Sequence, residues 1–360
     1  DTDGNGSADL IGATLDTLAV TISDVVVAVT DVASLTLSTG SFALASVTAA
    51  GESTARYTAL KMGTVTGTGT LDPDLPVDLT GTLTVSRLDY NAAAAGFGRL
   101  SWSSAFDLDE DGAFDDALVP GAGLTIDFAG SEEFALEGAV SAGAMSAGPV
   151  ALTLTDATVE FERRTVDVDA DGNGAADLIG ATLDALAITV TDVDVVVTGV
   201  ATLSLSSGSL ALALVTPAGG TAARYRALKM GSVTVSASTA SASDFGLSGI
   251  LTVGSLDYNG FDETQALARL NWANAFDLDE DGAYDDVLQP GAGLAIDFAA
   301  SLEFAAAGTV VGNGVAPAGT DAEGMTHVLL AAGPIYIGGM ADFALERRSV
   351  DVDSDGNGAA

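Results

Sequence analysis

The chain contains the same sequence pattern twice, and this internal repeat limits its possible folds more than any other feature. Asp1 recurs as Asp169, 168 positions later. The offset grows along the chain, because Glu162 recurs as Glu346. The second copy therefore carries an insertion, which lies near residues 313–329. Its Gly, Pro and polar residues predict a surface loop.

The repeat predicts the domain organisation directly. We expect one repeat unit at residues 1–168, a second at 169–352, and the start of a third at 353–360. A motif that begins a third time at the end of the chain favours a segment of a longer tandem array.

Each unit shows the pattern of β-strands. Residues 186–197 are rich in Val, Ile and Thr with period-two stretches, and residues 203–214 alternate on either side of a Ser-Gly pair that predicts a turn. Further strands are expected at 249–256, 294–298, 334–337 and 343–350. We find no capped helical stripe of useful length. The sequence therefore predicts an all-β fold, with tandem repeats of an antiparallel β-sandwich or of a β-roll or solenoid-like unit.

A nine-residue acidic motif, here called motif A, opens each unit. It reads Asp-x-Asp-Gly-Asn-Gly-x-x-Asp. Oxygen-bearing side chains at positions 1, 3, 5 and 9, with Gly at position 6, suit a calcium loop, and the glycine permits the sharp turn. The candidate ligands of motif A are Asp1, Asp3, Asn5, Asp9, Asp169, Asp171, Asn173, Asp177, and, where the motif begins again, Asp353, Asp355 and Asn357.

A second acidic motif, motif B, lies once inside each unit and has the same spacing. Its candidate ligands are Asp107, Asp109, Asp111, Asp115, Asp277, Asp279, Asp281 and Asp285. The backbone carbonyl at position 7 could add an oxygen to the four side chains, and calcium accepts six to eight oxygens. Magnesium fits less well, because it holds its water tightly.

Two alternatives accompany this interpretation. Asp, Asn and Gly also build hairpin turns without a metal, but such turns do not require an oxygen ligand at the same four positions in every copy. A second register of motif A, starting at Asp167, is also open. We favour the register that starts at Asp169, because Asp177 then occupies position 9.

Composition excludes several classes of partner. The chain has 12 Lys and Arg against 50 Asp and Glu, and a formal charge of −38. Nucleic acid is not expected as a partner, because phosphate binding needs clustered cations. No apolar run is long enough for a membrane span, so we expect no membrane insertion. The absence of Cys excludes disulfides and thiolate metal sites. So large a charge destabilises a compact state unless counter-ions bind, which favours bound cations.

Several residues outside the acidic motifs have predicted roles that do not involve a metal. Trp102 and Trp272 are expected in the core, with carbohydrate stacking as the alternative. The Arg pairs at 163–164 and 347–348 are expected to form local ion pairs, with contacts between neighbouring units as the alternative. His327 is expected to be exposed in the inserted loop, and one His without Cys cannot assemble a zinc site.

We expect no enzyme. The carboxylates could in principle supply the acid and base of a glycosidase, but they cluster in turn motifs that both units share. Nucleophile motifs such as Gly-x-Ser-x-Gly and phosphate-binding glycine loops are missing.

The acidic motifs resemble the calcium loops of FG-GAP-type and related extracellular repeat modules. The glycine-punctuated strands around them resemble the giant tandem-repeat surface and matrix proteins of environmental bacteria, although the Gly-Gly-x-Gly-x-Asp series of toxin-type β-rolls is absent. The resemblance implies an extracellular or cell-surface structural protein with Ca²⁺ in its loops. We expect a calcium-stiffened segment of a fibre or matrix filament, whose partners are neighbouring repeats or copies of itself. The alternative is an adhesin segment that binds glycan or a partner surface.

Overall fold

Every element in the described part of the chain is a β-strand, which confirms the all-β prediction. The computed structural model describes residues 1–2, 5–29, 33–63, 65–71, 77–121, 123–147, 150–197, 201–205, 208–231, 235–236, 246–247, 249–262, 264, 268–279, 281–291, 293–312, 314–315, 318–319, 323–332 and 335–350.

The chain divides into two compact units. Unit 1 comprises Asp1–Ala147, Thr155–Val166 and Thr182–Leu186, and unit 2 comprises Gly148–Leu154, Asp167–Ala181 and Ala187–Ala360. The strands that begin in the first part are β1 (Thr14–Val29), β2 (Ala33–Thr48), β3 (Tyr57–Met62), β4 (Val65–Leu71), β5 (Val77–Ala93), β6 (Leu118–Gly121), β7 (Leu124–Ile126), β8 (Glu132–Ala147) and β9 (Val150–Val168). Both β9 and β10 (Leu178–Val197) contribute residues to the two units.

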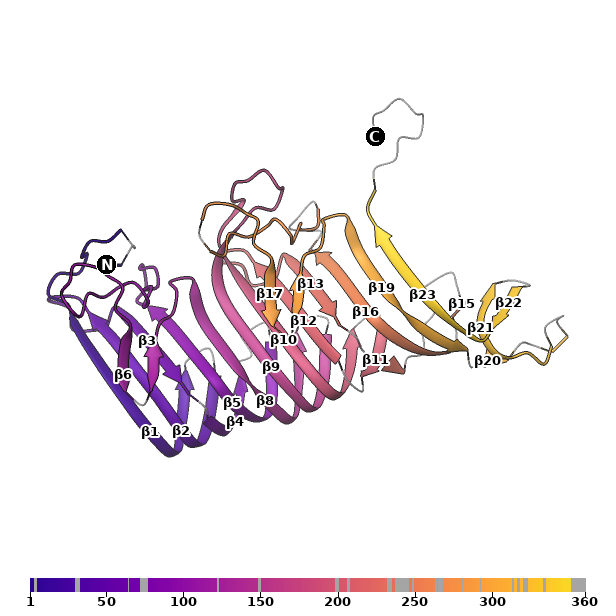
Figure 1. Cartoon of the computed structure of the whole chain (residues 1–360), viewed down its shortest axis with the longest axis horizontal. Helices are drawn as coiled ribbons and strands as arrows, with labels where there is room; N and C mark the ends of the chain where they lie inside the picture. Colours follow the sequence, from indigo (N-terminus) through magenta and orange to yellow (C-terminus); the bar gives the residue numbers. More distant parts are fainter. Residues whose placement is uncertain are drawn as a thin grey trace, which may run out of the picture. The chain divides into compact units, whose positions relative to one another are not determined.

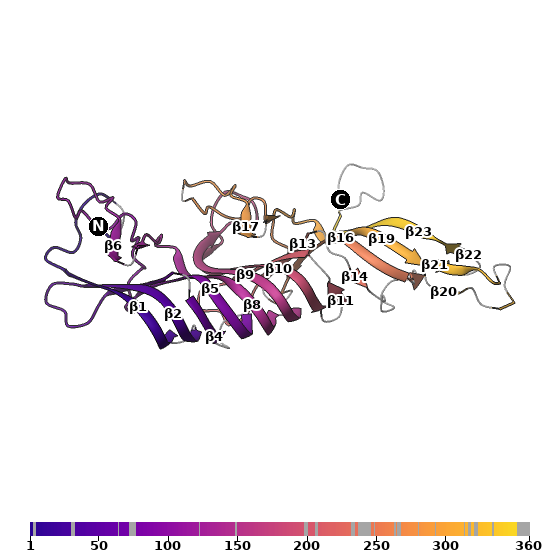
Figure 2. The same ribbon diagram turned by 60° about the horizontal axis from the view of Figure 1, so that its bottom comes forward.

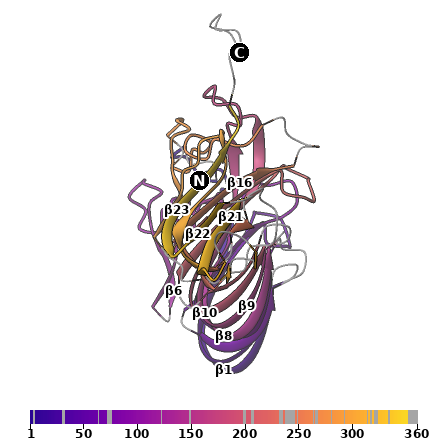
Figure 3. The ribbon, with the colours of Figure 1, turned by 90° about the vertical axis from the view of Figure 1, so that its right-hand side faces the viewer.

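Unit 1 is built on a meander of long strands in the order β1-β2-β3-β5-β8 (Figure 1). Strand β4 continues the place of β3, because it too pairs with β2 and β5. The long strands bend along their length, so that β1 and β8 follow nested arcs (Figure 3). Such meanders form readily, because each strand pairs with its neighbour in the sequence.

In unit 2 the order β12-β13-β16-β19 repeats the order β2-β3-β5-β8 of unit 1, and β23 follows β19 as β9 follows β8. The strands of unit 2 are β11 (Ala201–Leu205), β12 (Gly208–Thr216), β13 (Tyr225–Met230), β14 (Val235–Ser236), β15 (Gly246–Leu247), β16 (Gly249–Phe261), β17 (Leu288–Gly291), β18 (Leu294–Ile296), β19 (Leu302–Gly312), β20 (Gly314–Val315), β21 (Thr326–Ala332), β22 (Ile335–Gly338) and β23 (Met340–Arg348). The ladders from β1 to β8 and from β12 to β23, the pairings of β4, β11 and β14, and the small sheets of β6-β7, β17-β18 and β15-β20-β21-β22 are antiparallel.

The two units share not only strand order but also register. Tyr57 pairs with Ala93 on β5, and the residue 168 positions later, Tyr225, pairs with Phe261 on β16. The short hairpins correspond as well, since β6 pairs with β7 and β17 pairs with β18 with the same irregularity. Register is fixed by which side chains face the core, so equal sequence patterns give equal ladders.

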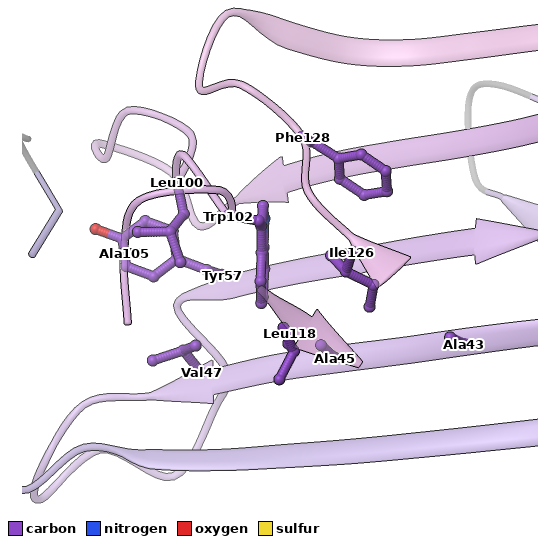
Figure 4. Close-up of a cluster of buried hydrophobic side chains, with 11 residues drawn as sticks. Ala43, Ala45, Val47, Tyr57, Leu100, Trp102, Ala105, Leu118, Ile126 and Phe128 are labelled. Carbon is purple, nitrogen blue, oxygen red and sulfur yellow. The ribbon is translucent and has the colours of Figure 1, made fainter. Parts of the chain in front are cut away.

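The core of unit 1 lies between the sheet and a loop layer that covers one of its faces. The loop after β5 brings Leu100 and Trp102 onto the sheet, and the β6-β7 hairpin adds Leu118 and Ile126 (Figure 4). Strand β6 of this hairpin is seen above the long strands of unit 1 in Figure 2. The sheet side of this cluster contains the fully buried alanines Ala43, Ala45 and Ala59. Small side chains here let the indole of Trp102 approach the sheet closely.

One expectation about local structure was wrong. The insertion at 313–329 is not simply a loop, because its described part contains β20 and the start of β21, which pair in a small sheet with β15 and β22. His327 is therefore on a strand, and its side chain lies outside the described part. The Ser-Gly pair expected to form a turn lies partly outside the described residues, because Ser207 is not described and Gly208 is the first residue of β12. Its counterpart in unit 1, Gly40, lies inside β2, which pairs with β1.

Candidate metal-binding loops

The acidic motifs lie at the ends of strands. Residues 169–177, here called loop A2, form the turn between β9 and β10, and loop A1 is its counterpart at residues 1–9. Residues 107–116 (loop B1) lie between β5 and β6, and residues 277–286 (loop B2) lie between β16 and β17.

In three of these loops the structure brings three carboxylates together. The groups are Asp107, Asp109 and Asp111 in loop B1, Asp169, Asp171 and Asp177 in loop A2, and Asp277, Asp279 and Asp281 in loop B2. In each group the carboxylate oxygens lie within 4.8 Å of one another. Two oxygens that bind one Ca²⁺ at about 2.3–2.6 Å can be at most about 5 Å apart. The spacing therefore fits a shared cation.

Backbone amides hold these carboxylates in place. In loop A2 the two oxygens of Asp169 accept hydrogen bonds from the amides of Gly172 and Gly174, both at 2.7 Å. The Oδ1 of Asp171 accepts from the amide of Asn173 at 3.1 Å, and the Oδ1 of Asn173 accepts from Ala175 at 2.9 Å. This ladder of Asx turns points the side chains at positions 1, 3 and 5 to one side of the loop.

The carboxylate that closes each loop also has a consistent role. In loop A2 the Oδ2 of Asp177 accepts from the amides of Ala170 and Asp171, at 2.8 and 3.1 Å. In loop B2 the same two contacts are made by Asp286, at 2.6 and 3.0 Å. Asp116 does the same in loop B1. Motif B is therefore one residue longer than motif A between the glycine and the closing carboxylate.

Position 9 of motif B accordingly has a different environment from that of motif A. The predicted ligands Asp115 and Asp285 do not belong to the three-carboxylate groups found in the described part of the chain. Sequence reasoning missed Asp116 and Asp286. Their signal was present as the Asp-Asp pair that ends motif B but not motif A.

Loop A1 follows the same scheme where it is described. Asp1 accepts hydrogen bonds from the amides of Asn5 and Gly6, at 3.2 and 2.7 Å, and Asp9 accepts from the amide of Thr2 at 2.6 Å. The predicted ligand Asp3 lies outside the described residues. So do the three candidates of the last motif, Asp353, Asp355 and Asn357.

The glycine at position 6 has the conformation that motif spacing requires. Its φ angle is +81° at Gly174, +93° at Gly112 and +91° at Gly282, a region that L side chains rarely adopt. Position 4 is also left-handed, at Gly172 with φ +78° and at Glu110 with φ +61°. A non-glycine residue with this φ is uncommon, so loop B1 carries local backbone strain.

Within unit 2 the A and B loops lie next to each other. Val168 forms an antiparallel bridge with Phe276, and the amide of Asp169 donates to the carbonyl of Ala275 at 3.1 Å. Asp169 and Asp277, the first candidate ligands of loops A2 and B2, therefore directly follow the two residues of this bridge. In unit 1 the amino group of Asp1 makes the equivalent bond to the carbonyl of Ala105, at 3.1 Å.

The loops concentrate negative charge. Desolvation, with the charges of Asp167, Asp277 and Asp169, raises the pKa of Tyr284. At Asp279 the backbone hydrogen bond from Asp281 lowers the pKa, but desolvation and the surrounding carboxylates outweigh it, so that the pKa is raised. A cation between these groups would remove the repulsion.

One carboxylate oxygen provides a direct test of whether the loops suit a metal. The Oδ2 of Asp107 accepts from the amide of Gly112 at 3.1 Å, but the Oδ1 is buried and has no hydrogen-bond partner in the described part of the chain. A buried oxygen without a partner is costly. A hard cation that binds Oδ1 would satisfy it, and the all-oxygen donor set is the one calcium prefers.

The tryptophans and arginines outside the acidic motifs pack in the core or form ion pairs. Trp102 and Trp272 are fully buried, which confirms the core prediction and excludes carbohydrate stacking on these rings. Each of the four arginines forms an ion pair. Arg164, Arg347 and Arg348 pair within their own predicted repeat unit, as expected, whereas Arg163 pairs across the predicted boundary at residues 168–169, which is the alternative. Arg163 pairs with Asp184, Arg164 with Glu162, Arg347 with Glu303 and Arg348 with Glu346.

Comparisons with protein-family models, with curated proteins and with solved structures found no match to this chain. In the described part of the chain, no helix is long and apolar enough to cross a membrane.

Proposed function

We propose that this chain is a structural segment of a secreted fibre or matrix filament, stiffened by Ca²⁺ in its acidic loops. The observation that carries the proposal is the convergence of three carboxylates in each of loops A2, B1 and B2. Like charges held within 4.8 Å of one another destabilise a fold unless a cation separates them. In each of these loops, hydrogen bonds from backbone amides also hold the carboxylates in the orientation that a shared cation would need.

The position of the loops suggests what the cation would do. Loop A2 is the turn between β9 and β10, and the residues at its start, Val168 and Asp169, bond to Phe276 and Ala275, which directly precede loop B2. Ca²⁺ in either loop would fix the strand ends that enter it. Because the metal binds only the folded loop, it adds about 2.7 kcal/mol per site when its concentration is a hundredfold above the Kd. With three such loops in the described part of the chain, the summed contribution would be about 8 kcal/mol, which is comparable with ordinary domain stability of about 5–15 kcal/mol.

Composition and binding strength support an extracellular location for the filament. Calcium sites in extracellular modules have Kd values of about 0.1–1 mM, which cytosolic calcium does not fill. The chain also dispenses with Cys, so loop-bound cations would take the stabilising place that disulfides have in many secreted proteins. The competing adhesin function is less well supported, because the two tryptophans that could stack on sugar rings are buried.

Thermal unfolding in CaCl₂ and in EDTA tests the proposal. We expect Ca²⁺ to raise the Tm of the wild-type chain. The double variant Asp107→Asn with Asp109→Asn should unfold in EDTA at the wild-type Tm or above, because the amides keep the hydrogen-bond acceptors and remove repulsion. In CaCl₂ it should gain less than the wild type.

The matched control is Glu137→Gln, an exposed strand residue outside the loops, which should keep the full calcium increment. Equal Tm values in CaCl₂ and EDTA for the wild-type chain would refute the proposal. An unchanged increment in the loop variant would remove loop B1 from it.

A further inference from the structure

The two acidic loops of unit 2 share one backbone contact at their bases. Val168 forms an antiparallel bridge with Phe276, and the amide of Asp169 donates to the carbonyl of Ala275 at 3.1 Å. These four residues are here called the shared base. Asp277, the first candidate ligand of loop B2, directly follows it, and both loops project beyond the same ends of the strands of unit 2 (Figure 1). The place of the first carboxylate in each loop therefore depends on the same contact.

The bridge also holds the residue that closes each loop. The carbonyl of Val168 accepts from the amide of Asp177 at 2.8 Å, and the carbonyl of Phe276 accepts from the amide of Asp286 at 3.1 Å. Val168 and Phe276 are fully buried, and the ring of Phe276 packs against Trp272 with the two centroids 5.7 Å apart. Each loop therefore begins and closes on the shared base, so an order imposed on one loop reaches the base of the other.

A buried charge in loop A2 points to a cation independently of the shape of the loop. Asp169 is 2% exposed, and its oxygens accept from backbone amides, among them those of Gly172 and Gly174 at 2.7 Å. None of the described ion pairs includes Asp169. A buried carboxylate without a cationic partner is costly. A divalent ion shared with Asp171 and Asp177 would supply the missing charge, and Asp169 would connect it to the shared base.

Two opposing effects decide how filling one loop acts on the other. Charge gives a negative effect, because a filled loop attracts a second cation less. This influence does cross between the loops: desolvation raises the pKa of Tyr284 in loop B2, and the charges of Asp167, Asp277 and Asp169 raise it further. Most of the candidate ligands are exposed, however, so water and salt screen their charges.

Ordering gives a positive effect. The carboxylates of an empty loop repel one another, and a cation fixes them together with the strand ends on which the loop begins and closes. The loop that fills second then meets a base that is already fixed, and it pays less to become ordered. Because the shared base is buried while most of the charges are screened, ordering is the larger of the two effects.

We propose that loops A2 and B2 bind Ca²⁺ as a coupled pair, in which filling either loop orders the shared base and raises the affinity of the other. The inference rests on the calcium part of the proposed function and adds its regulation, since a coupled pair fills over a narrower range of calcium than two independent sites. Coupling between sites is typically about 5–150-fold in affinity, and it is reciprocal. We expect at least about fivefold here.

Calcium titration of the full chain labelled with ¹⁵N-glycine tests the coupling. The amide of Gly174 reports on loop A2 and that of Gly282 on loop B2, because each donates to the first carboxylate of its loop. The variant Asp279→Asn with Asp281→Asn removes the B2 site. It leaves one negative charge on this group of three carboxylates, which is also the net charge of the group with one Ca²⁺ bound. An affinity lost at loop A2 therefore measures ordering and not charge, and we expect an at least fivefold loss.

The matched control makes the same substitutions in loop B1. The variant Asp109→Asn with Asp111→Asn should lose calcium at loop B1 itself. Loop B1 belongs to unit 1, and no described backbone hydrogen bond joins it to loop A2. The affinity read at Gly174 should therefore stay within about twofold of the wild-type value. In the reciprocal variant, Asp171→Asn with Asp177→Asn, the affinity of loop B2 should fall by the same factor as that of loop A2 does.

The wild-type titration is a second measurement that needs no substitution. The curves of Gly174 and Gly282 should rise together and more steeply than single-site curves. Independent single-site curves, or affinities that change less than twofold at both loops in the two variants, would overturn the coupling and leave the metal proposal intact. No shift at either glycine up to about 10 mM Ca²⁺, above the Kd of about 0.1–1 mM of extracellular modules, would reject both.

Discussion

The indole Nε1 of Trp102 donates a hydrogen bond to the Oδ1 of Asn91 at 2.9 Å, and neither side chain reaches solvent. The amide nitrogen of Asn91 in turn donates to the carbonyls of Leu100 and Ala129, at 3.0 and 3.2 Å. One side chain on β5 thereby holds both ends of the loop segment that covers the sheet. Unit 2 repeats the arrangement with Trp272 and Asn259.

We expect Asn91→Leu to destabilise unit 1 by about 2–4 kcal/mol, because it removes the partner of a buried indole N–H and the Asn91 hydrogen bond to the carbonyl of Leu100. The carbonyl of Ala129 loses one hydrogen bond and keeps the one from the amide of Glu132. Denaturant unfolding followed by tryptophan emission measures the loss. Asn259→Leu should cost a similar amount in unit 2. A cost below about 0.5 kcal/mol for either variant would show that the network does not hold the loop layer.

The ion pair between Arg87 and Glu132 is a second relationship, and the repeat supplies its own reference state. The Nη2 of Arg87 lies 3.3 Å from the Oε1 of Glu132, and Arg87 also binds the fully buried Asp89. In unit 2 the corresponding residues are Ser255 and Leu302. We expect Arg87→Ser alone to cost about 1–3 kcal/mol, because it leaves two carboxylates without this cation.

Adding Glu132→Leu to that variant should recover part of the loss, since it reproduces the pair found in unit 2. A double-mutant cycle of denaturant unfolding should give a coupling energy of about 1 kcal/mol. Strict additivity of the two single changes would contradict the prediction.

The titration of Glu132 predicts how stability depends on pH. Burial raises the pKa of Glu132 from its ordinary value of 4.5 to about 7; Arg87 and Arg164 lower it, and Asp89 and Glu162 raise it. The folded state therefore binds more protons than the unfolded state between these pH values. The free energy of unfolding should fall as pH rises from 4.5 to about 7, by at most about 3 kcal/mol from this group.

Glu132→Gln should remove this part of the pH dependence. Urea unfolding of both proteins in EDTA at several pH values measures it, with metal binding excluded. If the difference in stability between wild type and variant is the same at pH 4.5 and pH 8, Glu132 does not titrate as described.

The all-β class and several strands were predictable from the sequence, because the segments with a local strand pattern also find antiparallel neighbours to pair with. Residues 186–197 and 249–256 combine β-branched residues with period-two alternation, and both form strands. The insertion was misjudged because its Gly and Pro were given more weight than the apolar run at β21, which becomes a strand once β20 and β22 supply hydrogen-bond partners. Strand propensity depends on such context.

The candidate site was predictable at all three carboxylates of loop A2, including Asp177 at position 9, but in motif B only at positions 1, 3 and 5. Positions 1, 3 and 5 depend on local Asx turns, and the structure groups Asp107, Asp109 and Asp111 as the spacing predicts. The contact between Val168 and Phe276 joins segments that are far apart in the sequence, so no local motif could reveal it.

The closing residue of motif B provides a last prediction. The Oδ2 of Asp116 accepts from the amides of Leu108 and Asp109, whereas Asp115 is exposed; neither residue belongs to the group of Asp107, Asp109 and Asp111. We expect Asp116→Ala to increase amide hydrogen exchange at Leu108 and Asp109, because both N–H groups lose a charged acceptor, a loss of about 1–2 kcal/mol in local stability. Asp115→Ala should leave this exchange unchanged. Exchange measured by NMR in EDTA isolates the effect from metal binding, and equal effects of the two variants would mean that position 9 closes the loop after all.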